Sequence, residues 1–185
     1  MAESNTPLNL PLASMHERHL GLTPEVSAYY WQAACVCLDR HHTPPVVFAL
    51  LDGIAESQAE VSWLRTDERV RGAWANEIDT TEAGAYACAL AGTELMRGFV
   101  AVRRAETGTG ADYYVGLPGA GVDDLEDCFR LEVSGVDAGD ATALRRRLES
   151  KVNQARQGRG NLPALASVVG FKATQIYLAE VREDS

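Results

Sequence analysis

Residues 98–136 read GFVAVRRAETGTGADYYVGLPGAGVDDLEDCFRLEVSGV, and the prediction of the fold begins from this segment. It contains three short apolar segments, Phe99–Ala105, Ala111–Leu117 and Cys128–Ser134. A glycine-rich turn separates the first two segments, and a loop rich in proline, glycine and aspartate separates the last two. Short apolar segments joined by such turns predict three consecutive strands arranged as a meander.

Helical patterns flank this meander on both sides. Before it, we expect Asp79 to cap a helix over Thr80–Arg97, whose many alanines and glycines let it approach a sheet closely. After it, Ala141–Gln157 has the apolar periodicity of an amphipathic helix. The apolar segments Leu165–Phe171 and Thr174–Val181 then predict one or two closing strands. The expected order is therefore helix, three strands, helix and strand.

The N-terminal part has a different character. Residues 1–22 show no sustained periodicity, so we expect an irregular arm that packs loosely or frays. Thr23, followed by a proline and a glutamate, predicts the start of a helix that runs to about Arg40. A hairpin within residues 46–64 and a short helix over 67–76, capped by Thr66, complete this part.

A length of 185 residues is typical of one domain. We therefore predict a single α/β domain over residues 1–185, with a mixed central sheet flanked by helices. Residues 1–22 are its arm, 23–78 an N-terminal extension and 79–181 its core.

Four charged side chains stand out in the predicted core. Alternation along the third strand places Glu132 on the polar face, and Asp112 faces outward from the second strand. If these strands pair with their apolar faces aligned, both carboxylates lie on the same side of the sheet. Lys151 lies at the edge of the apolar arc of its helix, where it either snorkels to solvent or meets acids. Glu82 occupies the first turn of the helix that precedes the meander.

This order of elements and charges resembles the PD-(D/E)XK phosphodiesterase superfamily, which includes many restriction and repair nucleases. The resemblance covers about residues 80–172, and its motif parts are Gly110-Ala111-Asp112 and Glu132-Val133-Ser134. It implies a restriction-endonuclease-like αβββαβ core. The lysine that the superfamily usually has two residues after the strand glutamate is Ser134 here. Some members supply this lysine from the following helix, and Lys151 is the candidate for that position.

The resemblance also implies a chemistry. Asp112 and Glu132 would bind Mg²⁺ or Mn²⁺, which polarises a phosphoryl oxygen and lowers the pKa of a bound water. Lys151 would orient that water or stabilise the developing charge, and Glu82 would bind a second metal or its water shell. Gln154 is expected to touch the same region. The implied activity is metal-dependent hydrolysis of phosphodiester bonds in nucleic acid. Arginines available for phosphate contacts are Arg103, Arg104, Arg145, Arg146, Arg147, Arg156 and Arg159.

Each of the four residues has a purely structural alternative. Glu82 follows Asp79 at the spacing of a capping box. Asp112 can simply end the glycine-rich turn, Glu132 can be an exposed cross-strand partner, and Lys151 can snorkel. The alternative function is accordingly a catalytically inactive domain of the same fold that serves as an interaction or regulatory subunit. Ser134 favours this alternative.

The charge distribution bears on the partners. The net charge is −9, and residues 1–96 carry 5 Lys/Arg against 13 Asp/Glu, whereas residues 97–172 carry 11 against 10. An acidic N-terminal half repels nucleic acid but suits a basic partner protein. The predicted core is near neutral, so nucleic acid stays a candidate partner. Homodimerisation stays open.

Other classes of protein find less support. Four cysteines do not make a disulfide framework, and no apolar run reaches the ~18 residues that a membrane helix needs. We therefore expect a cytoplasmic protein. A zinc site at Cys35, Cys37, His41 and His42 is a minor alternative, because cysteines two apart on a helix point to different sides. Motifs for a serine nucleophile and for nucleotide phosphates are absent.

Overall fold

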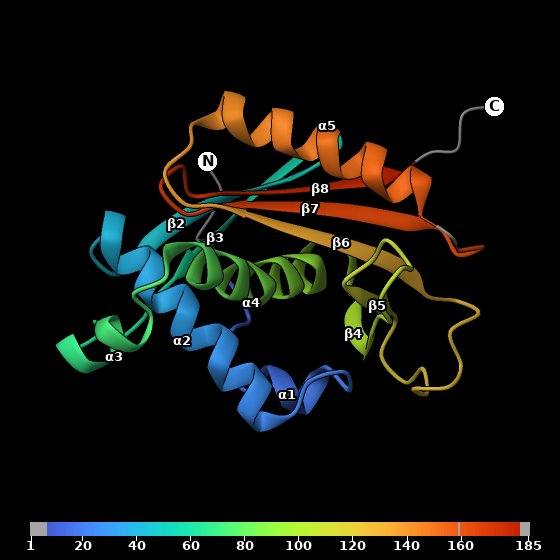
Figure 1. Ribbon diagram of the computed structural model, residues 1–185, viewed down its shortest axis with the longest axis horizontal. Coiled ribbons are helices and arrows are strands. Elements are labelled where there is room, and N and C mark those ends of the chain that lie inside the picture. The colour runs from blue at the N-terminus through green and yellow to red at the C-terminus, as the bar shows by residue number, and fades with distance from the viewer. Residues whose placement is uncertain (1–6, 159, 182–185) are drawn as a thin grey trace, which may run out of the picture.

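The computed structural model describes residues 7–158 and 160–181, and a mixed sheet lies at its centre (Figure 1). The eight described strands have the order β1–β3–β2–β8–β7–β6–β5–β4. They are β1 (Leu8–Asn9), β2 (Val46–Asp52), β3 (Ala55–Val61), β4 (Val100–Arg104), β5 (Tyr113–Gly116), β6 (Phe129–Val136), β7 (Ala164–Gly170) and β8 (Gln175–Val181). The described helices are α1 (Met15–Arg18), α2 (Pro24–His41), α3 (Glu68–Ala73), α4 (Glu77–Arg97) and α5 (Ala141–Gln157).

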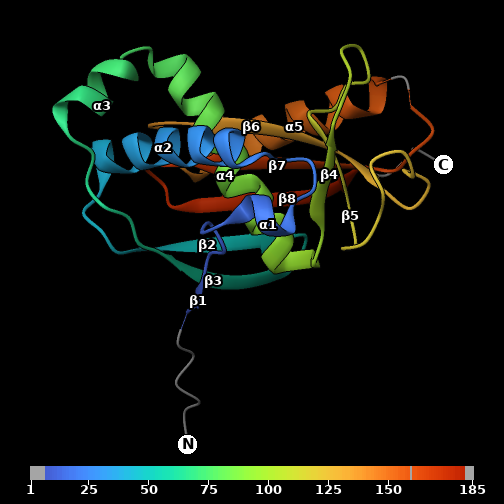
Figure 2. The ribbon, with the colours of Figure 1, turned by 90° about the horizontal axis from the view of Figure 1, so that it is seen from below.

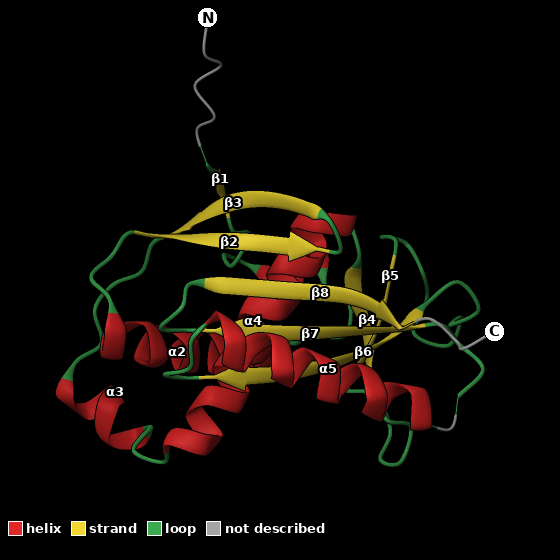
Figure 3. Ribbon diagram, turned by 90° about the horizontal axis from the view of Figure 1, so that it is seen from above, coloured by secondary structure: helices red, strands yellow, loops and turns green. Residues whose placement is uncertain are grey.

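Helices cover both faces of the sheet. α5 lies across one face (Figure 3), and α2 and α4 lie on the opposite face (Figures 1 and 2). This arrangement confirms the predicted α/β class with a mixed sheet flanked by helices. None of the helices in the described part of the chain is long and apolar enough to cross a membrane.

The meander forms where the sequence predicts it. β4 pairs antiparallel with β5, and β5 pairs antiparallel with β6. α5 then connects β6 to β7, which runs parallel to β6. The closing apolar segments form two strands, because β8 turns back antiparallel along β7.

β8 also links this region to the N-terminal hairpin. β2 runs parallel to β8 and antiparallel to β3, so strands from residues 23–78 and from residues 79–181 belong to one sheet. One apolar cluster likewise contains Leu38, Phe48, Leu90 and Val169. The N-terminal extension and the predicted core therefore contribute side chains to one hydrophobic core.

α4 approaches its neighbours closely, as its alanines and glycines predict. A Cβ atom on Gly84 would lie 2.9 Å from Cα of Ala34 in α2. On the sheet side, a Cβ on Gly135 of β6 would lie 2.6 Å from the carbonyl oxygen of Thr81 in α4. Glycine at these two positions lets backbones meet where any side chain would separate them.

The predicted loose arm is wrong for the residues that the structure describes. Leu10, Leu12 and Met15 are buried, and β1 pairs with β3. Residues 1–6 lie outside the described part of the chain. Apolar residues here have no regular spacing because the segment turns around α1 rather than forming a long element. The segment is held in place by burial of its apolar side chains, and such burial leaves no periodic pattern in the sequence.

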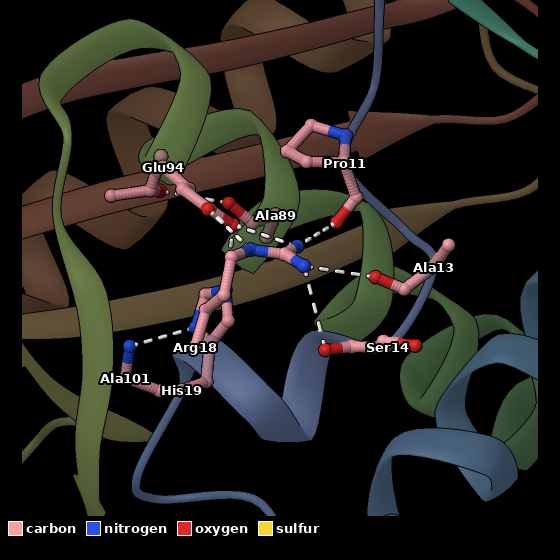
Figure 4. A network of polar contacts seen from close by, with 9 residues as sticks. Pro11, Ala13, Ser14, Arg18, His19, Ala89, Glu94 and Ala101 are labelled. Carbon is pink, nitrogen blue, oxygen red and sulfur yellow. Dashed lines mark hydrogen bonds and ion pairs between the residues drawn. The ribbon is translucent and has the colours of Figure 1, made fainter.

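A polar network attaches this segment to the edge strand β4 (Figure 4). His19 is fully buried, and its Nδ1 accepts a hydrogen bond from the Ala101 amide at 2.8 Å. The Glu94 carboxylate of α4 accepts from Arg18 Nε at 2.6 Å and from His19 Nε2 at 2.9 Å. The Gly21 amide donates to the Ala101 carbonyl at 2.9 Å. The backbone groups of the edge strand thereby obtain partners.

Two predicted helix caps are wrong. α4 begins at Glu77, and the side chain of Asn76 accepts from the amides of Ile78 and Asp79. α3 is capped by Asp67 rather than Thr66. Thr66 instead donates its hydroxyl and amide hydrogens to Asp39, a contact made across the fold. Neighbouring polar residues offer several caps, and at α3 a tertiary contact engages one of them.

Candidate functional site

A cleft opens at the edge of β6 between α4 and α5. β5 pairs with β6 over Phe129–Leu131, while β7 pairs with β6 along Arg130–Val136. The C-terminal half of β6 therefore has β7 on one side and the space left by the shorter β5 on the other. This cleft has a volume of about 480 Å³. Its lining includes Glu82, Asp112, Glu132 and Lys151.

Glu132 and Lys151 form an ion pair in this cleft. Lys151 Nζ of α5 donates to Glu132 Oε1 of β6 at 2.6 Å. The side chains are 18% and 7% exposed, respectively, so the pair is largely withdrawn from water. Burial raises the pKa of Glu132 above its ordinary value, the hydrogen bond from Lys151 counteracts this in part, and the charge of Asp112 adds to it. Of the two alternatives that the sequence offered for Lys151, the structure therefore shows contact with an acid and not snorkelling to solvent.

Asp112 precedes β5 and is held at the open edge of β6. Its amide donates to the Leu131 carbonyl at 2.8 Å, which places it opposite Glu132 on the neighbouring strand. Its Oδ2 accepts from the Val133 amide at 2.8 Å, and its Oδ1 accepts from the Tyr86 hydroxyl at 2.7 Å. Asp112 thus joins the strand ladder and extends it with its side chain, rather than ending the preceding turn.

Aromatic side chains and Arg104 surround Asp112. The Arg104 guanidinium lies 3.5 Å from Asp112 Oδ1 and donates to the Tyr86 hydroxyl at 3.1 Å. It also lies over the rings of Tyr86 and Tyr113, 4.6 and 4.8 Å from their centroids. Burial raises the pKa of Tyr86, so this phenol stays a protonated donor towards Asp112. The orientation of Asp112 is therefore set by α4, β4 and β6 together.

Glu82 lies on the wall that α4 contributes to the cleft. It is exposed, and it makes no hydrogen bond or ion pair with the residues that the structure describes. The capping-box interpretation is wrong, because α4 begins three residues before it was expected to and Asn76 is its cap. Gln154 contacts the same region as predicted, since its Oε1 accepts from Lys151 Nζ at 3.2 Å. Ser134 is half-buried and also lines the cleft.

The cleft contains residues that the sequence did not single out. Tyr86 follows Glu82 by four residues and therefore lies on the same face of α4, a spacing that could have revealed it. Asp137 follows β6, lines the cleft, and binds Arg40 at 3.1 Å and His41 at 3.0 Å, both from α2. The sequence names Arg104 only as a possible phosphate contact, and its position beside Asp112 and Tyr86 could not have been found locally, because it depends on the pairing of β4 with β5 and on the packing of α4.

The arginines proposed as phosphate contacts do not gather in one place. Arg147 lines the cleft, and Arg104 lies beside it on Asp112. Arg103 pairs with Glu106, and Arg156 lines a separate hollow. Arg159 lies outside the described residues. Arg145 and Arg146 are exposed on α5, so Arg147 is the proposed phosphate contact that lines the cleft in the described part of the chain.

The histidines and cysteines weighed for zinc have other partners. Cys35 and Cys37 are buried free thiols, and burial raises the pKa of both to about 12. His41 binds Asp137, and His42 binds the Phe171 carbonyl at 2.8 Å. Across residues 7–158 and 160–181, no group of three or more His, Cys, Asp or Glu side chains is arranged to hold a metal. A cation in the cleft would thus depend on fewer protein ligands.

Comparison with known proteins adds no relative. A scan against protein-family models gives no match, and searches of curated proteins and of solved structures give no significant match.

Proposed function

We propose that the protein is a metal-dependent phosphodiesterase that acts on nucleic acid. The observation that carries the proposal is the Lys151–Glu132 pair, 2.6 Å between Nζ and Oε1, in a cleft that Asp112 and Glu82 also line. These residues come from two helices, from the position just before β5 and from the middle of β6. Their convergence is what a site for charge stabilisation at a phosphodiester requires.

The chain topology supports the proposal. The elements from α4 to β7 follow the order helix, three strands, helix, strand, with an antiparallel meander and a parallel crossover. This is the order of the restriction-endonuclease-like αβββαβ core that the sequence resembles. Lys151 from α5 reaches the strand glutamate, which supports the proposal that it serves in place of the motif lysine that is Ser134 in this chain.

The donor chemistry of the cleft fits a hard divalent cation. Asp112 and Glu132 lie opposite each other on neighbouring strands, and Mg²⁺ is typically held by one or two carboxylates while waters and substrate phosphate complete its shell. Burial raises the pKa of Glu132, so a nearby positive charge is favourable. Asp112 and Glu132 would hold Mg²⁺ or Mn²⁺, which would supply Lewis-acid polarisation of the phosphodiester.

Side chains of the cleft would stabilise charge, orient Asp112, accept a proton and bind phosphate. Lys151 carries its ammonium group to the cleft, where it would stabilise the charge that develops on the phosphoryl oxygens. Tyr86 holds Asp112 in one orientation through the 2.7 Å hydrogen bond. Glu82, which has a free carboxylate in the described structure, would accept a proton from an attacking water or bind a second cation. Arg147 would bind a phosphate on the α5 side.

A catalytically inactive domain that binds a partner protein is the alternative, and one observation favours it. Both carboxylate oxygens of Asp112 accept hydrogen bonds from the chain, and Arg104 lies 3.5 Å away. Arg104 already supplies positive charge to the Asp112 carboxylate, so this carboxylate does not need a metal ion to balance its charge. A basic partner protein would then bind the acidic N-terminal half.

A cleavage assay separates the two functions. The purified chain is incubated with labelled single-stranded and duplex DNA and RNA in millimolar Mg²⁺ or Mn²⁺. We expect cleavage that falls by about 10²-fold or more in Glu132→Gln and in Asp112→Asn, because each change removes a charge from the proposed centre. Both amides keep an acceptor oxygen, so the fold is retained.

Matched controls make the assay specific. Glu149→Gln changes an exposed glutamate on α5, and Asp123→Asn changes an aspartate whose side chain is 97% exposed. Both controls should cleave as the parent does. Absence of cleavage by the folded parent with every substrate and both metals, or full activity in Glu132→Gln, would reject the phosphodiesterase and leave the partner-binding alternative.

A further inference from the structure

A second hollow lies beside the cleft, between α2, α3 and the start of α4. Its volume is about 630 Å³, within the ~300–1,000 Å³ of small-ligand sites. Glu77 lines both the cleft and this hollow. Arg40 of the hollow binds Asp137 of the cleft at 3.1 Å, so the two spaces share a wall. The two spaces are therefore adjacent.

Three arginines face this hollow, Arg40, Arg65 and Arg71. Arg65 and Arg71 are exposed, and the Arg65 side chain is 59% accessible. Arg71 uses NH1 to donate to the Thr66 carbonyl, and Arg65 approaches Asp39 only at 3.6 Å through Nε. A guanidinium carries five N–H donors, so most donors of these two side chains stay unused by the residues that the structure describes.

The two acids of the hollow do not cancel this charge. Asp39 accepts from Trp63 Nε1 at 2.7 Å and from the amide and hydroxyl of Thr66, each at 2.6 Å. Its side chain is 5% exposed, so it acts as an internal anchor for the segment that carries Arg65. Glu77 is exposed at the rim. Arg40 is paired with Asp137 and Arg65 with Asp39, whereas Arg71 has no carboxylate partner among the residues that the structure describes, so its positive charge is available to an anion in the hollow.

Apolar atoms form the floor of the hollow. Trp74 and Val36 line it and are largely buried, at 8% and 4% exposure. The Trp74 indole is fixed by a 2.9 Å hydrogen bond to Gln32 and by the Tyr29 ring, whose centroid lies 4.6 Å away. An aromatic side chain held in place beside guanidinium groups that keep unused N–H donors matches a ligand that has both a planar base and a phosphate.

We propose that this hollow binds one phosphate-bearing nucleotide of a single-stranded nucleic acid, while a neighbouring phosphodiester of the same strand occupies the cleft. The inference rests on the proposed function and names its substrate class as a single strand. A base in a duplex is stacked and paired, so it cannot enter a concave site of this size, whereas an unpaired base can. Arg65 and Arg71 contact the phosphate, and Trp74 contacts the base.

The test measures binding separately from cleavage. Full-length protein carrying Glu132→Gln is titrated against a fluorescein-labelled dodecameric thymidine oligonucleotide, read by anisotropy without added metal. Arg65→Glu and Arg71→Glu should each weaken binding by about tenfold or more, because each replaces a phosphate contact by a repulsive charge. Arg71→Gln should give a smaller loss in the same direction, and thermal melting confirms that each variant is folded.

Arg69→Glu is the matched control. Arg69 is an exposed arginine of the same helix α3 that does not line the hollow, so its reversal should weaken binding by less than about twofold. Equal losses in the Arg69, Arg65 and Arg71 variants would mean diffuse attraction and overturn the proposal. Duplex binding at least as tight as single-strand binding would overturn it too, as would no binding of the oligonucleotide. Binding of thymidine monophosphate as tight as that of the oligonucleotide would instead identify a free-nucleotide site.

The outcomes distinguish this inference from the proposed function. Cleavage by the parent with unchanged binding in the Arg65 and Arg71 variants would reject the hollow and retain the phosphodiesterase. The expected binding pattern without cleavage in any metal would retain the hollow as a binding site and reject the phosphodiesterase.

Discussion

At the scale of single residues, the cleft holds charges that depend on one another. Glu132 is nearly buried, and Lys151 Nζ at 2.6 Å is the cation that compensates it most closely. Removing one member of such a pair leaves a buried charge without a partner, which costs more than the pair itself contributes. The pair is therefore a sensitive point for stability as well as for the proposed chemistry.

We expect Lys151→Met to destabilise the protein by about 1–3 kcal/mol at pH 7, because the Glu132 carboxylate loses its cation. Since the pKa of Glu132 is already raised, its contribution favours folding below its ordinary pKa and is lost as pH rises through the higher folded value. Without Lys151 this folded value rises further, so the loss extends to higher pH. Urea unfolding of the parent and of the variant at pH 4.5 and pH 7 measures the difference.

The control for this prediction is the double variant Lys151→Met with Glu132→Gln. Replacing the carboxylate by a neutral amide should restore most of the lost stability at pH 7. An unchanged deficit in the double variant would show that packing of the lysine stem, and not charge, is responsible.

His19 provides a second titratable group, in the network of Figure 4. Burial lowers its pKa, although Glu94 acts in the opposite direction. The Ala101 amide donates to Nδ1, so protonation there would break this hydrogen bond. A lowered pKa means that stability is present above the ordinary value, ~6.5, and is lost as pH falls towards the folded value.

His19→Gln should accordingly flatten the dependence of unfolding free energy on pH between about 7.5 and 5.5, even though it lowers stability at both ends. Denaturant titrations at these two values measure the slope. The parent protein, titrated at the same two pH values, is the reference for this slope. A slope that persists in the His19 variant would assign the pH dependence to other groups.

At the scale of elements, the crossing of α2 and α4 depends on Gly84. A methyl group there would meet the Ala34 backbone at 2.9 Å, and backbone atoms cannot yield as a flexible side chain would. α4 carries Tyr86 and Glu82 to the cleft, so a shift of this helix also displaces the wall of the site.

We therefore expect Gly84→Ala to destabilise the protein by about 1–3 kcal/mol despite the better helix propensity of alanine. Gly72 in α3 is the matched control, since a Cβ there meets no atom within 4 Å. Gly72→Ala should be neutral or stabilise by up to about 1 kcal/mol. Thermal and urea unfolding compare the two variants, and a stabilising Gly84→Ala would contradict the close packing.

At the scale of the whole molecule, one sheet joins the N-terminal hairpin to the part that contains the cleft. A cation bound only by the folded state must stabilise the whole fold, by RT ln(1 + [L]/Kd). We expect millimolar Mn²⁺ to raise the melting temperature of the parent but not of Glu132→Gln. Mg²⁺ should act more weakly or equally, and Na⁺ at the same ionic strength is the control. A shift of equal size in the Glu132 variant would place the cation elsewhere.

The elements of the core could be predicted because their signals are local. Ala141–Gln157 is α5 to the residue, Gly98 ends α4 in a left-handed conformation, and the alternation around Glu132 puts Leu131 and Val133 in the core. Apolar spacing and capping residues act within a few positions, so a single sequence displays them. The arm and the cap of α3 were mispredicted because distant contacts decided between local options.

The candidate residues Asp112, Glu132, Lys151 and Glu82 were also visible in the sequence, as charges placed against an apolar pattern. The sequence did not show that these residues converge, because their convergence depends on the register of β5 on β6 and on the path of α5 across the sheet. The same holds for Arg104 on Asp112 and for the arginines of the second hollow. Local preferences are enough to predict the types of most elements and the chemical groups that they carry. Which of these groups meet depends on the packing of distant segments, because that packing sets their separation.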